Sequence, residues 1–286
     1  MIVYLNGEYM PAEEARISPF DRGFLFGDGI YDVTPSYSGK MVGFELHLAR
    51  LKAGLKSIGF SRELMTDSQW RDIAESLIER NQGENLGIYF HVSRGSEGRR
   101  LHAIPDNIPA TIFCMTIAID PHPEIPDRST QKGLKAMLAE DLRWRRCNIK
   151  STALLGNILH FQQGYDNGQN EVLLHNSDGE LTEASHSNVF IVKDGVVATP
   201  LLDHQKLPGI SRHIVLETLR ADESVVVNER VIKVEELLDA DEIWITNSSK
   251  HIAPIVELDG KPVGDGNVGA VWEHAMRVYE ASKFDF

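Results

Sequence analysis

The stretch around which the chain is organised covers residues 140–151 and reads Glu140-Asp-Leu-Arg-Trp-Arg-Arg-Cys-Asn-Ile-Lys-Ser151. It places four cations close together in an otherwise acidic chain, and the last of them, Lys150, precedes a helical pattern. Nearby positive charge disfavours the ammonium form of a lysine, and a neutral lysine amine can form a Schiff base with a carbonyl. An isolated run of this kind is more often a solvated basic turn, so its interpretation depends on the other motifs in the chain.

The composition excludes several classes of protein. The chain has 286 residues, with 29 Lys and Arg against 42 Asp and Glu, and a formal net charge of −13. This charge argues against nucleic acid and anionic membrane surfaces as partners. No apolar run reaches membrane-spanning length, and the N-terminal residues do not read as a secretory signal. Two cysteines, Cys114 and Cys147, do not make a disulfide framework, so a cytoplasmic protein is expected.

The first 120 residues predict a small α+β domain. Asn6-Gly7 predicts a hairpin turn within residues 2–9, and apolar spacing predicts helices over 44–58 and 67–81, the second opened by a Thr66–Gln69 capping box. Strands are predicted over 30–37, 86–94 and 110–119, with Pro35 expected to confine the first to an edge or a bulge. The long Gly- and Arg-rich loop 94–105 is of a type that often carries function.

Prolines predict a linker over residues 121–130, so a second domain is expected over residues 131–286. Helices are predicted over 152–166, just after residue 212, and over 268–283. Strands are predicted over 134–140, 171–175, 187–192, 196–199, 224–230, 242–246 and 252–258. Because strands and helices do not alternate strictly, the sequence predicts a two-domain α+β fold rather than a doubly wound parallel sheet.

Three further motifs could each bind a charged group. Pro208-Gly-Ile-Ser211 opens a helix, and the free N–H groups at a helix N-terminus attract anions. Thr246-Asn-Ser-Ser249 adds hydroxyl groups at the end of a strand, and Glu183 places a carboxylate at a turn before another strand. Taken singly, each of these is more often an ordinary helix cap or a surface residue.

Taken together, the motifs resemble the fold-type IV pyridoxal phosphate enzymes, the family of branched-chain and D-amino-acid aminotransferases. The resemblance covers nearly the whole chain. It rests on segments that occur in one order: Phe26-Gly-Asp-Gly-Ile-Tyr31, His47-Leu-Ala-Arg-Leu51, Asp141 through Lys150, Thr182-Glu-Ala-Ser-His-Ser-Asn-Val-Phe190, Leu207-Pro-Gly-Ile-Ser-Arg212 and Thr246-Asn-Ser-Ser-Lys-His-Ile-Ala-Pro-Ile255. The resemblance implies a two-domain α+β fold and a pyridoxal 5′-phosphate cofactor, with no metal.

The resemblance also implies roles for individual residues. Lys150 is expected to hold the cofactor through a Schiff base and to move the proton between the substrate Cα and the cofactor C4′. Glu183 is expected beside the pyridine nitrogen, where a carboxylate keeps the ring protonated, with Asn188 supporting it. The groups expected to bind the phosphate are Arg50, the N–H groups of Ile210 and Ser211, and the hydroxyl of Ser248.

Within this family, the D-amino-acid aminotransferases resemble the chain most, in residues 140–150 and in Arg100-Leu-His102. This implies that Arg100 and His102, with Tyr31, bind the α-carboxylate of a D-amino acid, and that the loop reaches in from the partner subunit of a homodimer. A 2-oxo acid such as 2-oxoglutarate or pyruvate would accept the amino group. A solvated basic loop is the alternative interpretation of this segment.

The chain also departs from the family pattern. Asp32 stands where glutamate is usual, Thr34-Pro-Ser36 replaces bulkier residues, and His186 replaces a small polar residue. Residues 31–36 are expected to line the substrate side-chain pocket, so the preferred side chain stays open.

Three alternative functions remain at this point. An L-branched-chain aminotransferase is disfavoured by Arg100-Leu-His102. A lyase of the aminodeoxychorismate type shares the fold and the lysine. A cofactor-binding protein without catalytic activity is disfavoured, because Lys150, Glu183 and Arg50 are all present.

Overall fold

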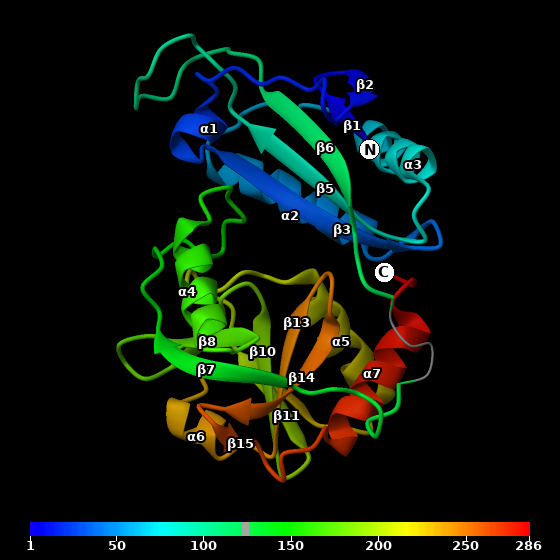
Figure 1. Cartoon of the computed structure of the whole chain (residues 1–286), viewed down its shortest axis with the longest axis vertical. Coiled ribbons are helices and arrows are strands. Elements are labelled where there is room, and N and C mark those ends of the chain that lie inside the picture. Colours follow the sequence, from blue (N-terminus) through cyan, green and yellow to red (C-terminus); the bar gives the residue numbers. More distant parts are fainter. Residues whose placement is uncertain (122–125) are drawn as a thin grey trace. The chain divides into compact units, whose positions relative to one another are not determined.

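The chain forms two compact units in the computed structural model, which describes residues 1–121 and 126–286 (Figure 1). The first unit contains Met1–Pro121, Ile149–Leu154 and Phe286, and the second contains the other described residues. The sequence-based boundaries differ from this division mainly at Ile149–Leu154, which belongs to the first unit although it lies within the predicted second domain. The centre of the predicted linker, residues 122–125, lies outside the described residues.

An antiparallel six-stranded sheet with the order β2-β1-β6-β5-β3-β4 supports the first unit. Its strands are β1 (Ile2–Leu5), β2 (Glu8–Pro11), β3 (Gly29–Tyr37), β4 (Lys40–Met41), β5 (Asn85–Ser93) and β6 (Thr111–Ala118). The predicted hairpin between β1 and β2 is confirmed, and its turn residues Asn6 and Gly7 have φ values of 50° and 107°. Such left-handed conformations suit asparagine and glycine, which explains why this dipeptide predicts the turn.

Pro35 lies inside β3, which pairs with β5 along its whole length but with β4 only at residues 36 and 37. The N–H of Val42 donates to the carbonyl of Pro35, so the polar groups of Pro35 face β4. The nitrogen of Pro35, which carries no hydrogen, therefore faces the two-residue edge strand β4, and no hydrogen bond to β5 is lost. This is the position in which a sheet tolerates a proline.

Three helices complete the first unit: α1 (Arg22–Phe26), α2 (Phe44–Ser57) and α3 (Asp67–Asn81). The predicted capping box at Thr66 and Gln69 is present. Helices α2 and α3 pack on one face of the sheet, and the core between them is made mainly of Ile30, Ile88, Phe90, Val92, Leu48, Leu51, Trp70 and Leu77. The apolar spacing of α2 and α3 is thus explained by burial against this sheet.

The alternation of β3 corrects the expectation that residues 31–36 all line one pocket. Asp32, Thr34 and Ser36 lie on the strand face that carries Ile30, and all three are buried. That face packs against α2, since Ile30 contacts Gly54 and Asp32 bonds to side chains of α2. Tyr31 and Val33 point to the opposite face, because successive side chains of a strand alternate.

The second unit is built on a mixed sheet with the order β12-β11-β10-β13-β14-β7-β8-β9, and β15 pairs with β14. Three strand pairs are parallel, β11 with β12, β14 with β7, and β7 with β8. The strands are β7 (Leu134–Glu140), β8 (Glu171–His175), β9 (Leu181–Ala184), β10 (Asn188–Lys193), β11 (Val196–Pro200), β12 (Val227–Arg230), β13 (Glu242–Asn247), β14 (His251–Leu258) and β15 (Lys261–Pro262). This mixed arrangement is the α+β architecture that the sequence predicts.

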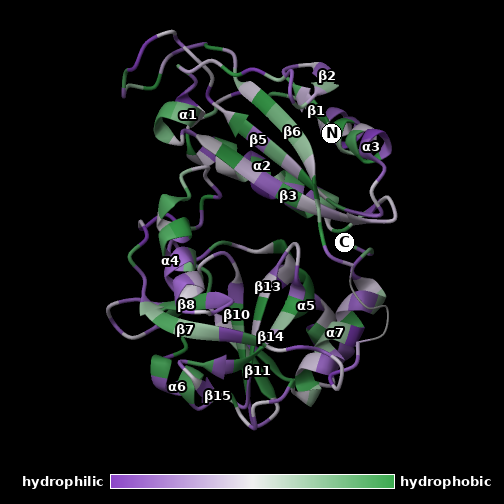
Figure 2. Ribbon diagram, viewed as in Figure 1, coloured by the Kyte–Doolittle hydropathy of each residue, from purple (hydrophilic) through white to green (hydrophobic). Residues whose placement is uncertain are grey.

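The helices of the second unit are α4 (Leu155–Asp166), α5 (Ile210–Asp222), α6 (Val234–Leu238) and α7 (Ala270–Ser282). Helix α4 begins later than the predicted residue 152, because Ser151 and Thr152 bond to β3 in the first unit. Figure 2 shows hydrophobic residues on α4, where Leu155, Ile158 and Leu159 are exposed in the single chain. Within the described residues, no helix has the length and apolarity needed to cross a membrane.

Candidate active site

The first unit positions Lys150 through its backbone. Residues 149–154 run beside β3, where the N–H of Tyr31 donates to the carbonyl of Lys150 over 3.0 Å and Ile30 pairs with Ser151. The Lys150 Nζ then lies 3.3 Å from the hydroxyl of Tyr31 and 4.3 Å from the centre of its ring. Lys150 and Tyr31, which were predicted for different roles, are therefore neighbours within this unit, and the amine lies near a second proton donor.

Arg50 lies on α2, and its side chain is bound to Asp32 of β3. Its Nε and Nη2 donate to the two carboxylate oxygens of Asp32 over 2.8 and 2.7 Å, and the Nδ1 of His47 lies 2.7 Å from one of them. Asp32 is 1% exposed. Burial raises the pKa of such a carboxyl, but Arg50 and His47 overcome this effect and hold the Asp32 pKa well below its usual range. Asp32 thus fixes the direction of the arginine that is predicted to bind a phosphate.

The face of the sheet that carries Tyr31 also carries an aromatic group that the sequence did not single out. Tyr89 stacks on Tyr31 with ring centres 5.6 Å apart, and its hydroxyl lies 3.0 Å from Nδ1 of His91. Burial raises the pKa of Tyr89 to about 12 and lowers that of His91, so both side chains are held neutral. The sequence did not point to these neighbours, because Tyr89 and His91 meet Tyr31 only through the pairing of β5 with β3.

Arg100 and His102 lie in the loop between β5 and β6, and both residues are exposed in the single chain. Their side chains meet at the ring of Phe26: the Arg100 guanidinium carbon is 5.1 Å from its centre, and the His102 ring is 5.2 Å away. The two residues predicted to bind a carboxylate therefore both pack against the ring of Phe26.

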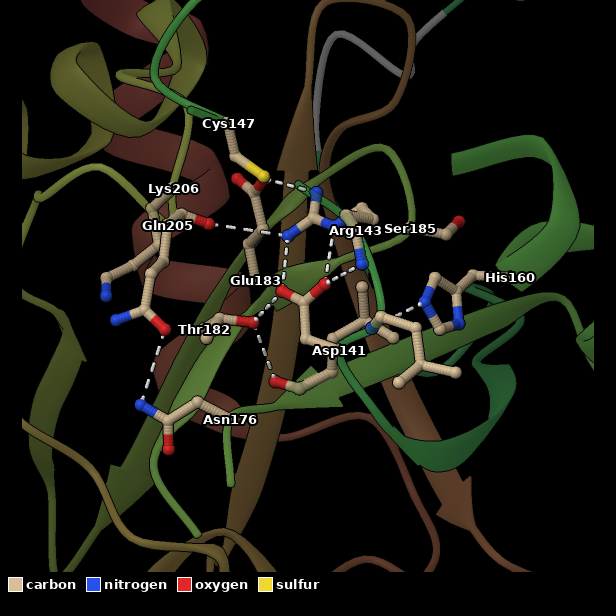
Figure 3. Close-up of polar contacts among 12 residues, drawn as sticks. Asp141, Arg143, Cys147, His160, Asn176, Thr182, Glu183, Ser185, Gln205 and Lys206 are labelled. Atoms are coloured by element: carbon tan, nitrogen blue, oxygen red, sulfur yellow. Dashed lines mark hydrogen bonds and ion pairs between the residues drawn. The ribbon is translucent and has the colours of Figure 1, made fainter. Parts of the chain in front are cut away.

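In the second unit, Glu183 belongs to a buried network around Arg143 (Figure 3). The guanidinium, whose side chain is 3% exposed, donates to Glu183 over 2.6 Å and to the two carboxylate oxygens of Asp141 over 2.9 and 2.7 Å. Burial raises the pKa of Glu183, while Arg143 and the N–H of Leu207 oppose this rise. Burial also favours a higher pKa for Asp141, but the hydrogen bonds and the charge of Arg143 outweigh burial, so the pKa of Asp141 lies below its usual value.

This network corrects the initial interpretation of the basic stretch 140–151. Arg143 is compensated by two carboxylates, so it does not act as an unpaired positive charge that would favour a neutral lysine. A sequence signal for this was present, since Asp141 lies two residues before Arg143. The partner Glu183, however, is 40 residues away in the chain.

Asn188 connects Glu183 with the start of α5. Its amide donates to Glu183 over 3.2 Å and to the carbonyl of Leu207 over 2.9 Å. Helix α5 begins at Ile210 after the cap residue Gly209, and a Cβ at Gly209 would lie only 2.0 Å from Asn188 Oδ1. Glycine is therefore required by this close approach, and Glu183, Asn188, Ile210 and Ser211 are brought into one neighbourhood.

Ser248 lies in the turn between β13 and β14, beside Thr246, which pairs with Asn188 across the sheet. Asn247 holds this turn, because its side chain accepts the N–H groups of Ser249 and Lys250. The Thr246 hydroxyl is buried and has no hydrogen-bond partner among the described residues. The hydroxyls of Thr246 and Ser248 and the first N–H groups of the 13-residue helix α5 are each donors that suit an anion such as phosphate.

Among the described residues, no group of three or more His, Cys, Asp or Glu side chains is placed to hold a metal ion. His186, which departs from the expected pattern, contacts the buried Glu171 through Nδ1 at 3.1 Å. Glu171 also accepts hydrogen bonds from the hydroxyls of Ser185 and Ser187. His186 therefore stabilises the turn between Glu183 and Asn188.

Comparison with known proteins identifies several relatives. The model of the family described as amino-transferase class IV matches residues 29–258. A D-alanine aminotransferase of Staphylococcus epidermidis is 34% identical over 280 residues, covering 97% of this chain and 96% of the relative. One from Listeria monocytogenes is 34% identical over 277 residues, covering 95% and 92%.

Solved structures with the same fold include the T.th. branched-chain amino acid aminotransferase with pyridoxamine 5′-phosphate. It has a TM-score of 0.90 and 20% identity, and the match covers 99% of this chain and 94% of that one. The Escherichia coli branched-chain amino acid aminotransferase has a TM-score of 0.88 at 20% identity, with coverage of 96% and 92%. At this level of identity, the structures show the fold.

Proposed function

This chain belongs to the class IV aminotransferase family, and we propose that it transfers the amino group of D-amino acids, such as D-alanine and D-glutamate, to a 2-oxo acid. 2-Oxoglutarate and pyruvate are the acceptors we expect. One observation carries this proposal: the Lys150 amine lies 3.3 Å from the hydroxyl of Tyr31. The side chains of Arg100 and His102, paired at the ring of Phe26, add a cationic group suited to a carboxylate. The relatives described as D-alanine aminotransferases support the choice of substrate class.

Pyridoxal 5′-phosphate is the cofactor, and when bound it withdraws electrons from the substrate Cα, which makes the proton there easier to remove. The residues present fit this group. Lys150 would hold its aldehyde carbon covalently through Nζ, and Glu183, supported by Asn188, would accept a hydrogen bond from the ring nitrogen. The groups that would bind its phosphate are Arg50, the N–H groups of Ile210 and Ser211, and the hydroxyl of Ser248.

The residues of the chain itself would divide the remaining work. The Lys150 amine would take the proton from the substrate Cα, with Tyr31 3.3 Å away to orient it. Arg100, His102 and Tyr31 would bind the α-carboxylate, which every amino-acid substrate carries. An arginine fork recognises a carboxylate by charge and direction, so this contact would fix the orientation of the substrate relative to Lys150.

We also infer that the active enzyme is a homodimer in which this loop serves the partner's active site. Exposed hydrophobic side chains lie on the loop and on α1, namely Leu101, Ile104 and Phe24. Such side chains in one region favour burial against another protein surface, and a twofold pairing with a second copy is the commonest arrangement. A fully active monomer in sedimentation experiments would contradict this inference.

The decisive experiment is a set of parallel assays with the cofactor-loaded enzyme and 2-oxoglutarate. D-Alanine, L-alanine and L-leucine are supplied separately, and the oxo acid formed from each is measured. We expect product from D-alanine only. Product from L-leucine would indicate a branched-chain aminotransferase. Pyruvate released from 4-amino-4-deoxychorismate without an acceptor would indicate a lyase.

A further inference from the structure

The segment Phe26-Gly-Asp-Gly-Ile-Tyr31 carries no role in the proposed reaction except at Tyr31, yet it forms a tightly held corner. Helix α1 ends at Phe26 and is capped by Gly27, whose φ of 64° is left-handed, and β3 begins at Gly29. A Cβ at Gly27 would lie 2.9 Å from the Cβ of Ala153, so glycine is required both by the backbone and by this close approach. The corner is therefore built to receive other parts of the chain.

One side of the corner holds the segment of Lys150. The Thr152 N–H donates to the carbonyl of Gly29 over 3.0 Å, and the Thr152 hydroxyl donates to the carbonyl of Gly27 over 3.1 Å. With the bond from the Tyr31 N–H to the carbonyl of Lys150, three hydrogen bonds hold Lys150 and the two residues that follow it against the corner.

The other side of the corner holds the loop of Arg100 and His102, through the side chain of Arg22. Its Nη1 donates to the carbonyls of Leu101 and Ala103 over 2.5 and 3.2 Å, and its Nη2 donates to that of His102 over 3.3 Å. The Arg22 side chain is only 7% exposed, and its guanidinium carbon lies 4.8 Å from the centre of the Phe26 ring. One buried guanidinium therefore holds three consecutive carbonyls directly after Arg100.

Asp28 in turn orients Arg22. One carboxylate oxygen of Asp28 accepts two hydrogen bonds, from Nε of Arg22 over 2.7 Å and from Nε of Arg94 over 2.8 Å. Burial raises the pKa of Asp28, but Arg94 and Arg22 outweigh this effect and lower it. The backbone adds two bonds, from the Arg94 N–H to the carbonyl of Asp28 and from the Arg22 N–H to the carbonyl of Gly95. The start of the loop and its tip are thus tied to the same corner.

We propose that Arg22, oriented by Asp28, is a positioning residue that holds the loop so that Arg100 and His102 are ready to bind the substrate carboxylate. The proposal rests on the proposed function of that loop. A long loop loses conformational entropy when it closes on a ligand, and fixing it beforehand reduces that loss. Because Arg22 holds the loop through its backbone carbonyls, its effect on the reaction must pass through the loop and should appear in substrate binding.

The test compares Arg22→Ala with Arg99→Ala, a matched control in the same loop whose side chain is 68% exposed. In Arg22→Ala, we expect kcat/KM for D-alanine to fall roughly 10- to 100-fold, mainly through KM, because the charged contacts that order the loop are lost. The visible absorption of the bound cofactor should stay unchanged, and Arg99→Ala should keep wild-type kinetics.

A double-mutant cycle with Arg100→Ala shows whether Arg22 acts through the loop. If it does, adding Arg22→Ala to Arg100→Ala should cause little further loss. Losses that multiply would overturn the proposal, because Arg22 would then act somewhere else. If Arg100→Ala alone has no effect on D-alanine, the carboxylate site of the proposed function fails instead.

Limited digestion with trypsin measures the loop directly, since it cleaves after Arg99 and Arg100. Cleavage there should be faster in Arg22→Ala than in the wild type. A rate of cleavage equal to that of the wild type, or faster cleavage with unchanged kinetics, would overturn the proposal. Should Arg22→Ala fail to fold, Asp28→Asn replaces it, because it weakens the orientation of Arg22 and should cause smaller changes in the same direction.

Discussion

Two buried networks, one in each unit, combine arginine and carboxylate groups in different proportions. In the first unit, one carboxylate, Asp32, faces the guanidinium of Arg50 and the imidazole of His47, whose pKa is lowered by burial. In the second unit, one guanidinium, Arg143, faces the carboxylates of Asp141 and Glu183. The first network carries no net charge while its histidine is neutral, and the second carries one negative charge when both carboxyls are ionised.

This difference in charge agrees with the roles proposed for Arg50 and for Glu183. A neutral network that includes an arginine can receive an anionic phosphate without repulsion, whereas a network with an extra carboxylate favours a protonated ring nitrogen. We propose that the ratio of guanidinium to carboxylate, rather than the presence of either, separates these two proposed roles. Each prediction below changes one of these networks or separates the chemistry from both.

The largest effect is expected from Lys150→Ala, which leaves both networks intact. We expect kcat to fall by more than about a thousandfold, because this amine would both hold the cofactor and move the proton. The absorption of the covalently held cofactor should also disappear. Lys135→Ala, at a side chain 54% exposed, is the control. Turnover like that of the wild type would remove Lys150 from the mechanism.

Arg143→Met should cause the largest loss of stability, because it leaves Asp141 and Glu183 buried without their shared cation. Removing one partner from a buried ion pair costs about 3–5 kcal/mol. Urea unfolding of the variant should show this loss, and Arg145→Ala, an exposed arginine of the same stretch, should show none. Equal stability of the two variants would mean that the carboxylates do not depend on Arg143.

A smaller effect is expected from Asp32→Asn, because Arg50 is partly exposed and an amide can still accept one hydrogen bond. We expect a loss of about 2 kcal/mol in the free energy of unfolding and roughly tenfold weaker binding of pyridoxal 5′-phosphate in an absorbance titration. Asp32→Glu keeps the charge and is the matched variant, which should retain most of the affinity. If both variants bind the cofactor like the wild type, Asp32 does not orient Arg50 for the phosphate.

The smallest effect concerns pH. Burial lowers the pKa of His47, although Asp32 opposes this, and Arg50 and Lys150 also lower it. The unfolded chain therefore binds this proton more readily, and stability should fall as pH drops below about 6.5. Between pH 7.5 and 5.5 this loss is at most about 1.4 kcal/mol. The pH dependence of urea unfolding should be weaker in His47→Gln by up to this amount; an unchanged dependence would show that His47 titrates as in the unfolded chain.

Local patterns predicted much of the fold. Helices α2 and α3, the Asn6-Gly7 hairpin and the strand β7 follow from periodicity, capping and turn chemistry, which act between near neighbours. The short elements α1, β4, α6, β9 and β15 were not predicted, because none of them shows a clear apolar period over its two to five residues. The start of α4 was predicted too early, because Thr152 bonds to Gly29 in the first unit instead of continuing the helical pattern.

Short motifs were sufficient for the family resemblance, for the order of most elements, and for the candidates Lys150, Glu183 and Arg50. The side chains that these residues contact became apparent only in the folded chain. Folding brought Glu183 to Arg143 across 40 residues and turned Asp32 toward α2. It also placed Arg22 against the loop of Arg100, where Arg22 bonds to the carbonyl of His102, 80 residues further along the chain. Such contacts arise from the pairing of strands and the packing of helices, and these join residues whose separation in the sequence carries no local signal.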